Sequence, residues 1–181
     1  HALAAGDRDV ALDLVDGAAE RAIARGELAT VARWVAALPR GATLERPRLG
    51  LDPAWALAHT GRLDAAEATL HRVRATLEAT RDERDCRLWG NAMAVEARIA
   101  ALRGDVDRTV ALSRRALALG GTGSFLTRGD LTLNLAFALY DGGHDDAAIA
   151  AFADAWVEAR DGGNARAALL ACRYRAIVEM L

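Results

Sequence analysis

A short motif recurs along the chain: a glycine, an acid three residues later and a small residue five residues later. The four copies are Gly6/Asp9/Ala11, Gly61/Asp64/Ala66, Gly104/Asp107/Thr109 and Gly143/Asp146/Ala148. Each copy lies between stretches rich in alanine and leucine. Glycine adopts the left-handed conformation that closes a helix, and the dipole of the next helix favours an acid in its first turn. The motif therefore predicts repeated helix–turn–helix units, which are typical of an α-solenoid.

Apolar periodicity and helix-ending residues predict about nine helices. The expected helices cover residues 9–25, 28–38, 47–60, 63–80, 85–103, 106–119, 125–141, 145–160 and 164–181. Alanine dominates and only 5% of residues are aromatic, which favours closely packed helices over strands. We therefore expect an all-α fold, a right-handed α-solenoid forming a single domain over residues 1–181. Because the chain starts at His1 within repeat-like sequence, we interpret it as a fragment of a longer protein.

The repeats are similar to tetratricopeptide repeats but longer. The turn glycines Gly26, Gly61, Gly104 and Gly143 lie 35, 43 and 39 residues apart, against about 34 in a standard tetratricopeptide repeat. Small residues recur where paired helices must interlock. They are Ala54, Ala97 and Ala136 before the turns, and Ala18, Val73, Ala116 and Ala155 after them. The usual tyrosine of the first helix is missing, so the expected units are tetratricopeptide-like.

Charge and cysteine content narrow the class of protein. The formal net charge of −2 at pH 7 does not indicate a polyanion partner. No apolar run reaches the roughly 20 residues of a membrane span. Cys86 and Cys172 fall in helices two repeats apart, so we expect no intrachain disulfide and a reducing, cytoplasmic location.

Three segments together resemble a known family. They are HALAAGDRDVALDLV, then VARWVAALPRGATLERPRLGLDPAWALAHTGRLDAAEATL, then the later G-D-x-D and G-G-x-D-D-A-A turns. Their order resembles the helical-repeat domain of the large ATP-binding regulators of the LuxR family, the MalT-type transcriptional activators. The resemblance covers most of the chain and is best over residues 1–75.

The resemblance implies a place in a larger regulator. Such proteins carry an ATP-binding module, a winged-helix piece, a helical-repeat sensor and a C-terminal helix-turn-helix that binds DNA. The repeats would bind a small inducer or a partner protein and control ATP-dependent self-assembly. The chain itself has no G-x-x-x-x-G-K-[ST] motif and no basic recognition helix, so we expect neither a cofactor nor direct nucleic-acid contact.

The first helix of each pair is expected to line a concave groove. Tetratricopeptide spacing, counted back from the turn glycines, places on this wall Arg48, Leu51, Trp55, Ala58, Asn91, Ala94, Arg98, Ala101, Asp130, Leu133, Phe137 and Tyr140. Arginine binds carboxylate or phosphate through paired hydrogen bonds, and aromatic rings supply contact area. We therefore predict that the groove binds a ligand or partner. The residues predicted to contact it are Arg48, Trp55, Asn91, Arg98, Phe137 and Tyr140. Alternatively, the aromatic residues belong to the core and the arginines are solvated.

Other candidate sites have simpler explanations. One turn gathers Asp141, His144, Asp145 and Asp146. These residues are interpreted as helix-capping, and no metal site is expected. His59 and His71 lack a catalytic partner at an informative spacing, so we interpret them as packed or surface histidines. The GGTGS sequence at 120–124 follows a helix and lacks lysine, unlike a phosphate-binding loop. No catalytic constellation stands out, so we do not expect an enzyme.

Three functions remain open. The first is the effector- or partner-binding sensor module of an ATP-dependent LuxR-family transcriptional regulator. The second is a generic protein–protein interaction scaffold, and the third is a regulatory repeat domain attached to a signalling enzyme such as a kinase. Both ends lack the polar caps of terminal repeats, so self-association of the chain is a further prediction.

Overall fold

The computed structural model describes residues 8–25, 27–38, 46–80, 86–119 and 128–180. These residues form nine helices and no strands, which confirms the all-α class. The helices are α1 (Arg8–Ala24), α2 (Leu28–Ala36), α4 (Pro47–His59), α5 (Leu63–Thr80), α6 (Cys86–Leu102), α7 (Val106–Ala118), α8 (Arg128–Asp141), α9 (Asp145–Asp161) and α10 (Ala165–Val178). None of these helices is long and apolar enough to cross a membrane. Cys86 of α6 and Cys172 of α10 are both exposed.

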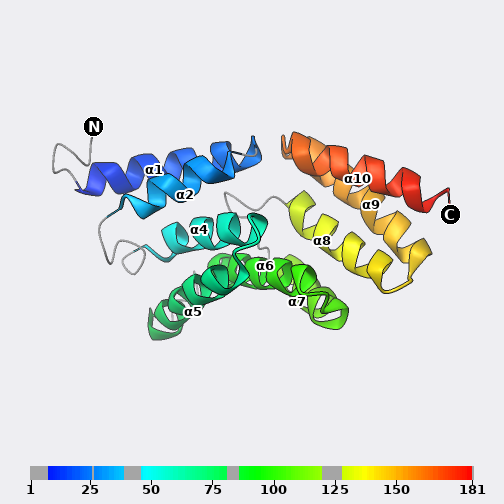
Figure 1. Cartoon of the computed structure of the whole chain (residues 1–181), viewed down its shortest axis with the longest axis horizontal. Helices are drawn as coiled ribbons and strands as arrows, with labels where there is room; N and C mark the ends of the chain where they lie inside the picture. The colour runs from blue at the N-terminus through cyan, green and yellow to red at the C-terminus, as the bar shows by residue number, and fades with distance from the viewer. Residues whose placement is uncertain (1–7, 26, 39–45, 81–85, 120–127, 181) are drawn as a thin grey trace.

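Consecutive helices pair, and the pairs stack in chain order. The pairs are α1 with α2, α4 with α5, α6 with α7, and α8 with α9, while α10 packs on α8 and α9. The first helices of successive pairs also contact one another, α4 with α6, α6 with α8 and α8 with α10. Figure 1 shows the helices along an arc, with α1 and α2 at one end and α10 at the other. This order of contacts is that of an α-solenoid; its right-handedness stays a prediction.

The turns between helices are built alike, as the recurring glycine predicts. Gly61, Gly104, Gly143 and Gly163 have φ angles of 76°, 76°, 73° and 72°. In each turn the N–H after the glycine donates to a carbonyl of the preceding helix, at 2.9 Å from Arg62 to Leu57 and 3.0 Å from Asp105 to Ala100. This is the Schellman closure of a helix. The first copy of the motif, at Gly6, lies outside the described residues.

Small residues let the paired helices approach closely. Ala66, Thr109 and Ala148, each five residues after a turn glycine, are 0% exposed. The alanines seven residues before the turns, Ala54, Ala97 and Ala136, are also 0% exposed. The close helix contacts expected from the alanine-rich composition are therefore present.

The buried apolar residues form two main clusters that meet within α8. The first cluster runs from α1 to α7 and ends at Leu131 of α8. The second begins at Leu133 of the same helix and continues through α9 and α10. Its centre is aromatic, because Phe152 is fully buried and its ring packs edge-on against that of Phe137, with 5.3 Å between centroids. The array therefore has two main cores, joined through α8 and through α7, whose Ala116 belongs to the first core while Val110 packs on the second.

Candidate functional site

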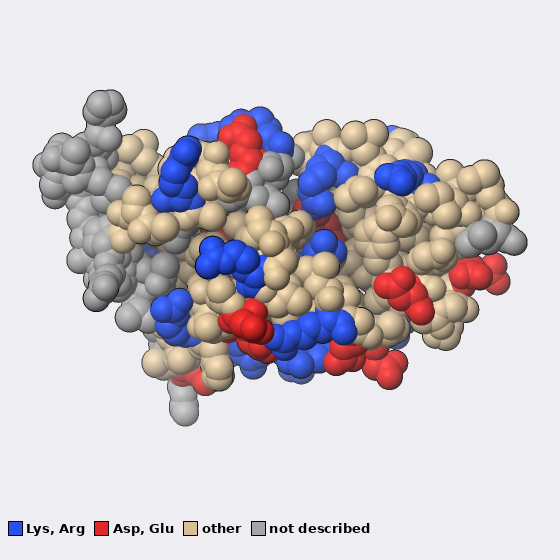
Figure 2. Space-filling view, in the orientation of Figure 1, with Lys and Arg blue, Asp and Glu red and all other residues tan. Residues whose placement is uncertain are grey.

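A cavity of about 320 Å³ opens where the two cores meet. The described residues that line it come only from α4, α6, α8 and α10, the inner helices of successive pairs. They are His59, Arg98, Ala101, Leu102, Asp130, Leu133, Asn134, Phe137, Asp141, Arg166, Leu170 and Tyr174. Figure 2 shows basic side chains around a recessed acidic patch near the middle of this face.

Two of the six predicted contact residues line this cavity. Arg98 of α6 and Phe137 of α8 lie in its wall, together with Ala101, Asp130 and Leu133 from the wider set. Arg48 lies in α4, but its side chain is outside the described part of the chain. Tyr140 is half-buried and packs against the second core instead of facing the cavity. The structure thus brings Arg98 and Phe137 together, and whether they bind a ligand stays a prediction.

The placement of Trp55 on the groove surface is wrong. Its side chain is 1% exposed and belongs to the first core. The imidazole of His59, one turn later in α4, covers the indole with 4.2 Å between ring centroids. Asn91 is also buried, at 2% exposure, and does not reach the cavity. For these two positions the core interpretation is correct, because neighbouring helices cover them.

Several residues that line the cavity were not among the predicted contacts. For three of them, their position in the repeat could have indicated it. His59, Leu102 and Asp141 each lie two residues before a turn glycine, so one further repeat position faces the cavity. Three more, Arg166, Leu170 and Tyr174, lie on one face of α10 at intervals of four residues. The sequence has no turn glycine after α10 from which their positions could be counted.

One side of the cavity is fixed by the carboxylate of Asp130, which is 3% exposed. It forms an ion pair with the Arg166 guanidinium and accepts a hydrogen bond from Asn164 Nδ2 at 2.5 Å. The Asn164 amide oxygen in turn accepts from the Ala167 N–H at 3.1 Å, which caps the first turn of α10. The acid is thus buried with its charge and hydrogen bonds satisfied by α10.

The opposite side holds Arg98, whose polar atoms are less well satisfied. Its Nη1 donates to Asn134 Oδ1 at 3.3 Å, which is long for a hydrogen bond. The buried Arg98 Nε and the buried Asn134 Nδ2 have no hydrogen-bond partner among the described residues. Burial lowers the pKa of Arg98, and the nearby charge of Arg166 lowers it further, while Asp130 opposes both effects. Arginine nevertheless stays protonated in proteins, so a desolvated positive charge borders the cavity.

His59 contributes no charge at neutral pH. Desolvation, together with the charges of Arg98 and Arg166, lowers the pKa of His59 to about 3. Its Nδ1 lies 3.2 Å from the carbonyl oxygen of Trp55. The imidazole therefore acts as a neutral wall between the first core and the cavity.

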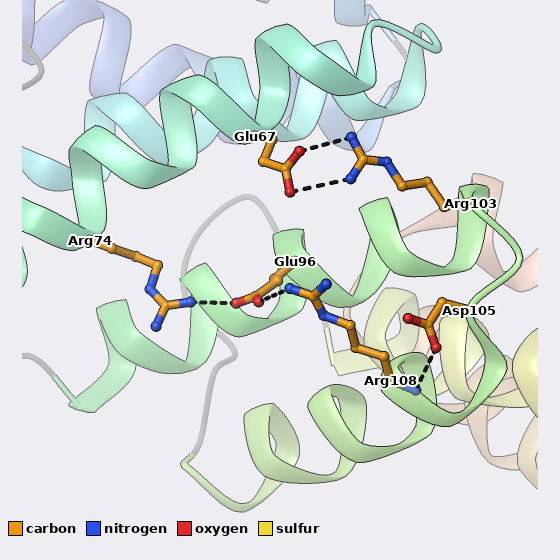
Figure 3. Close-up of polar contacts among 6 residues, drawn as sticks. All are labelled: Glu67, Arg74, Glu96, Arg103, Asp105 and Arg108. Atoms are coloured by element: carbon orange, nitrogen blue, oxygen red, sulfur yellow. Dashed lines mark hydrogen bonds and ion pairs between the residues drawn. The ribbon is translucent and has the colours of Figure 1, made fainter.

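A second cavity, of about 340 Å³, lies between α5, α6 and α7 and differs in its charges. Figure 3 shows that its arginines are held by carboxylates. Glu96 accepts from Arg74 at 2.7 Å and from Arg108 at 2.6 Å, and Glu67 accepts from Arg103 at 2.8 Å. A ligand entering there would have to displace these ion pairs, so the first cavity is the better candidate site.

The described residues contain no group of histidine, cysteine, aspartate or glutamate side chains arranged to hold a metal ion. The capping interpretation of the α8–α9 turn holds only in part, because the His144 side chain at the N-cap makes no capping hydrogen bond and Asp141 lines the first cavity. Asp145 and Asp146 lie in the first turn of α9, where the helix dipole favours negative charge.

Comparison with known proteins places the chain beside one group of regulators. It is 33% identical over 117 residues to the HTH-type transcriptional regulator MalT of Klebsiella pneumoniae subsp. pneumoniae, a match covering 65% of this chain. It is 30% identical over 128 residues to the protein of the same name from Cronobacter sakazakii, covering 71% of this chain. The chain contains a MalT-like helical region.

The matched region is a small part of those regulators. The chain spans 13% of the length of the Klebsiella protein and 14% of the Cronobacter protein. No protein-family model matches the chain. No solved structure matches it either.

Proposed function

We propose that the chain is the effector- or partner-binding sensor module of a MalT-like, ATP-dependent transcriptional regulator of the LuxR family. The observation that carries this proposal is the cavity on the inner helices α4, α6, α8 and α10. The similarity to MalT regulators supports the link to transcription. The role is non-catalytic and cytoplasmic.

The cavity has the size of a small-molecule site, with a lining more polar than is usual. Its volume of about 320 Å³ falls at the lower end of the range for such sites, which are mostly apolar with a few placed polar groups. Apolar lining comes from Leu133, Phe137 and Leu170, and polar lining of similar extent comes from residues that include Arg98, Asn134, Asp130, Asp141 and Arg166. A molecule bound here would contact residues on the sides of both main cores. Binding would stabilise their arrangement and so change the contacts that the array makes with neighbouring modules.

The parent protein would supply the other activities. We propose that ATP-binding and DNA-binding modules lie in the same polypeptide, as the family resemblance implies. A generic interaction scaffold and a repeat domain attached to a kinase remain the alternatives. The sequence of the full gene separates them: a parent chain without a phosphate-binding loop and a helix-turn-helix would contradict the regulator proposal.

Ligand binding is tested by a thermal-shift screen of small metabolites, followed by hydrogen exchange with each compound that raises Tm. We expect protection of amides in α6 and α8. In Ala101→Phe, an aromatic ring occupies the cavity lining, and we expect binding to be lost. The matched control is Ala111→Phe, because Ala111 is exposed on α7. If no compound or peptide binds, or if binding survives Ala101→Phe, the cavity is not the site.

A further inference from the structure

Arg98 is the cation of the cavity that lacks a carboxylate partner in a hydrogen bond. Its one hydrogen bond among the described residues goes to the neutral amide of Asn134, at 3.3 Å. Other arginines of the same fold bind carboxylates directly, as in the pair of Arg128 with Glu158 at 2.6 Å. A buried positive charge is normally paired, because removing it from water is unfavourable. Among the described residues no carboxylate is hydrogen-bonded to Arg98, so a bound anion can take that place.

The acids near Arg98 do not fill this role. The charge of Asp130 attracts that of Arg98, but the Asp130 carboxylate is bound by Arg166 and Asn164 of the α10 side. Asp141 is exposed and makes no ion pair among the described residues. His59 is neutral, so it neither repels nor neutralises a bound anion.

The unsatisfied atoms beside the cavity are both donors. Arg98 Nε and Asn134 Nδ2 are buried nitrogens, and Asn134 itself is 3% exposed. Only an acceptor can satisfy them. A carboxylate or phosphate group would also balance the charge, whereas a neutral carbonyl or hydroxyl would not.

From these contacts we propose that the cavity binds a small anionic effector, with its carboxylate or phosphate on Arg98 and Asn134. The apolar part of the molecule lies against Phe137 and Leu170, which line the same cavity. Because both donor nitrogens are buried, the side chains of Arg98 and Asn134 must turn toward the cavity for an anion to reach them. This movement breaks the long Arg98–Asn134 bond, which is weak at 3.3 Å. The inference rests on the proposed sensor function and specifies the chemical class of its ligand.

The test uses three probes with similar apolar bodies: 3-phenylpropionate, phenyl phosphate and the neutral 3-phenylpropanamide. Binding is measured by NMR titration of the whole 181-residue chain at low ionic strength. We expect at least one anion to bind, with shifts in α6 and α8, and the amide to bind about 10- to 100-fold more weakly, as for a lost charged hydrogen bond. A response to phenyl phosphate alone would assign the effector to the phosphates, and a response to 3-phenylpropionate alone would assign it to the carboxylic acids.

Three variants test the role of Arg98. Arg98→Gln and Arg98→Met are expected to reduce anion binding to the level of the amide while leaving the fold intact, because each removes a desolvated charge. Arg98→Lys keeps the charge but not the paired hydrogen bonds, so an intermediate affinity is expected. The matched control is Arg108→Gln, which removes an arginine of the second cavity and should leave anion binding unchanged.

The outcomes separate this inference from the proposed function. Equal binding of the amide and the anions, or anion binding unaffected by Arg98→Gln and Arg98→Met, overturns the anion site but leaves a neutral effector in the cavity. If neither anion binds while the metabolite screen finds neutral ligands, the anion site is likewise overturned and the proposed sensor function is kept. Failure of the whole screen removes the sensor proposal itself.

Discussion

The contact between α8 and α9 depends on the absence of one side chain at Gly129. A Cβ atom added there would lie 2.5 Å from the backbone nitrogen of Ala159 and 2.6 Å from its Cα and Cβ atoms. Ordinary contacts to a Cβ are 3.4–4 Å, so Gly129→Ala requires α8 and α9 to separate by about 0.9 Å. The obstacle is mostly backbone, and a side-chain rotation cannot relieve it.

The expected effect on stability follows from two opposing terms. Overpacking of this kind destabilises a protein by about 1–3 kcal/mol. The better helix propensity of alanine returns at most about 1 kcal/mol. We expect Gly129→Ala to lower the free energy of unfolding by about 1–2 kcal/mol, which for a chain of this length decreases Tm by roughly 2–8 °C.

The assay is urea denaturation followed by circular dichroism, with calorimetry for Tm. Gly17→Ala is the matched control, because a Cβ at Gly17 of α1 meets nothing within 4 Å. This variant should gain about 0.5–1 kcal/mol from helix propensity alone. If Gly129→Ala is as stable as Gly17→Ala, then α8 and α9 do not approach as closely as described.

Three other predictions concern stability. Trp55→Ala removes a fully buried ring and should lower the free energy of unfolding by about 3–5 kcal/mol in urea denaturation. A decrease below about 1 kcal/mol would contradict the burial of this side chain. The pKa of His59 is about 3 when folded against 6.5 when unfolded, so its contribution is complete above pH 6.5 and decreases as the pH falls toward 3. Between pH 7 and 5.5, the free energy of unfolding of the wild type should therefore decrease by about 1 kcal/mol more than that of His59→Gln, as measured by denaturation at each pH. Equal decreases would refute the lowered pKa of His59. Gly104→Ala forces alanine into φ of 76° and should reduce stability by about 1–2 kcal/mol, with Gly104→Asn less affected; scanning calorimetry compares the two.

The helices could be predicted closely because their ends are determined by local chemistry. Gly61, Gly104 and Gly143 adopt the positive φ that the motif requires. Pro47 begins α4, as its fixed φ and missing N–H favour. These signals depend only on residues that are neighbours along the chain, so helix ends can be predicted from the sequence without the tertiary structure.

The site could be predicted only in part, because exposure depends on neighbouring helices. Repeat spacing places Trp55 and Arg98 at equivalent positions, six residues before a turn glycine. The first is buried beneath His59, and the second reaches the cavity. The ion pair of Asp130 with Arg166 joins residues 36 apart, and no pattern in the sequence indicates it.

Two cores that share only α7 and α8 need not melt together. The residues from α1 to Leu131 and those from Leu133 to Val178 can act as separate cooperative units, each with its own unfolding free energy. An occupant of the cavity between them would touch both units at once and would merge their transitions into one. Cooperativity of unfolding would then report occupancy, independently of any change in shape.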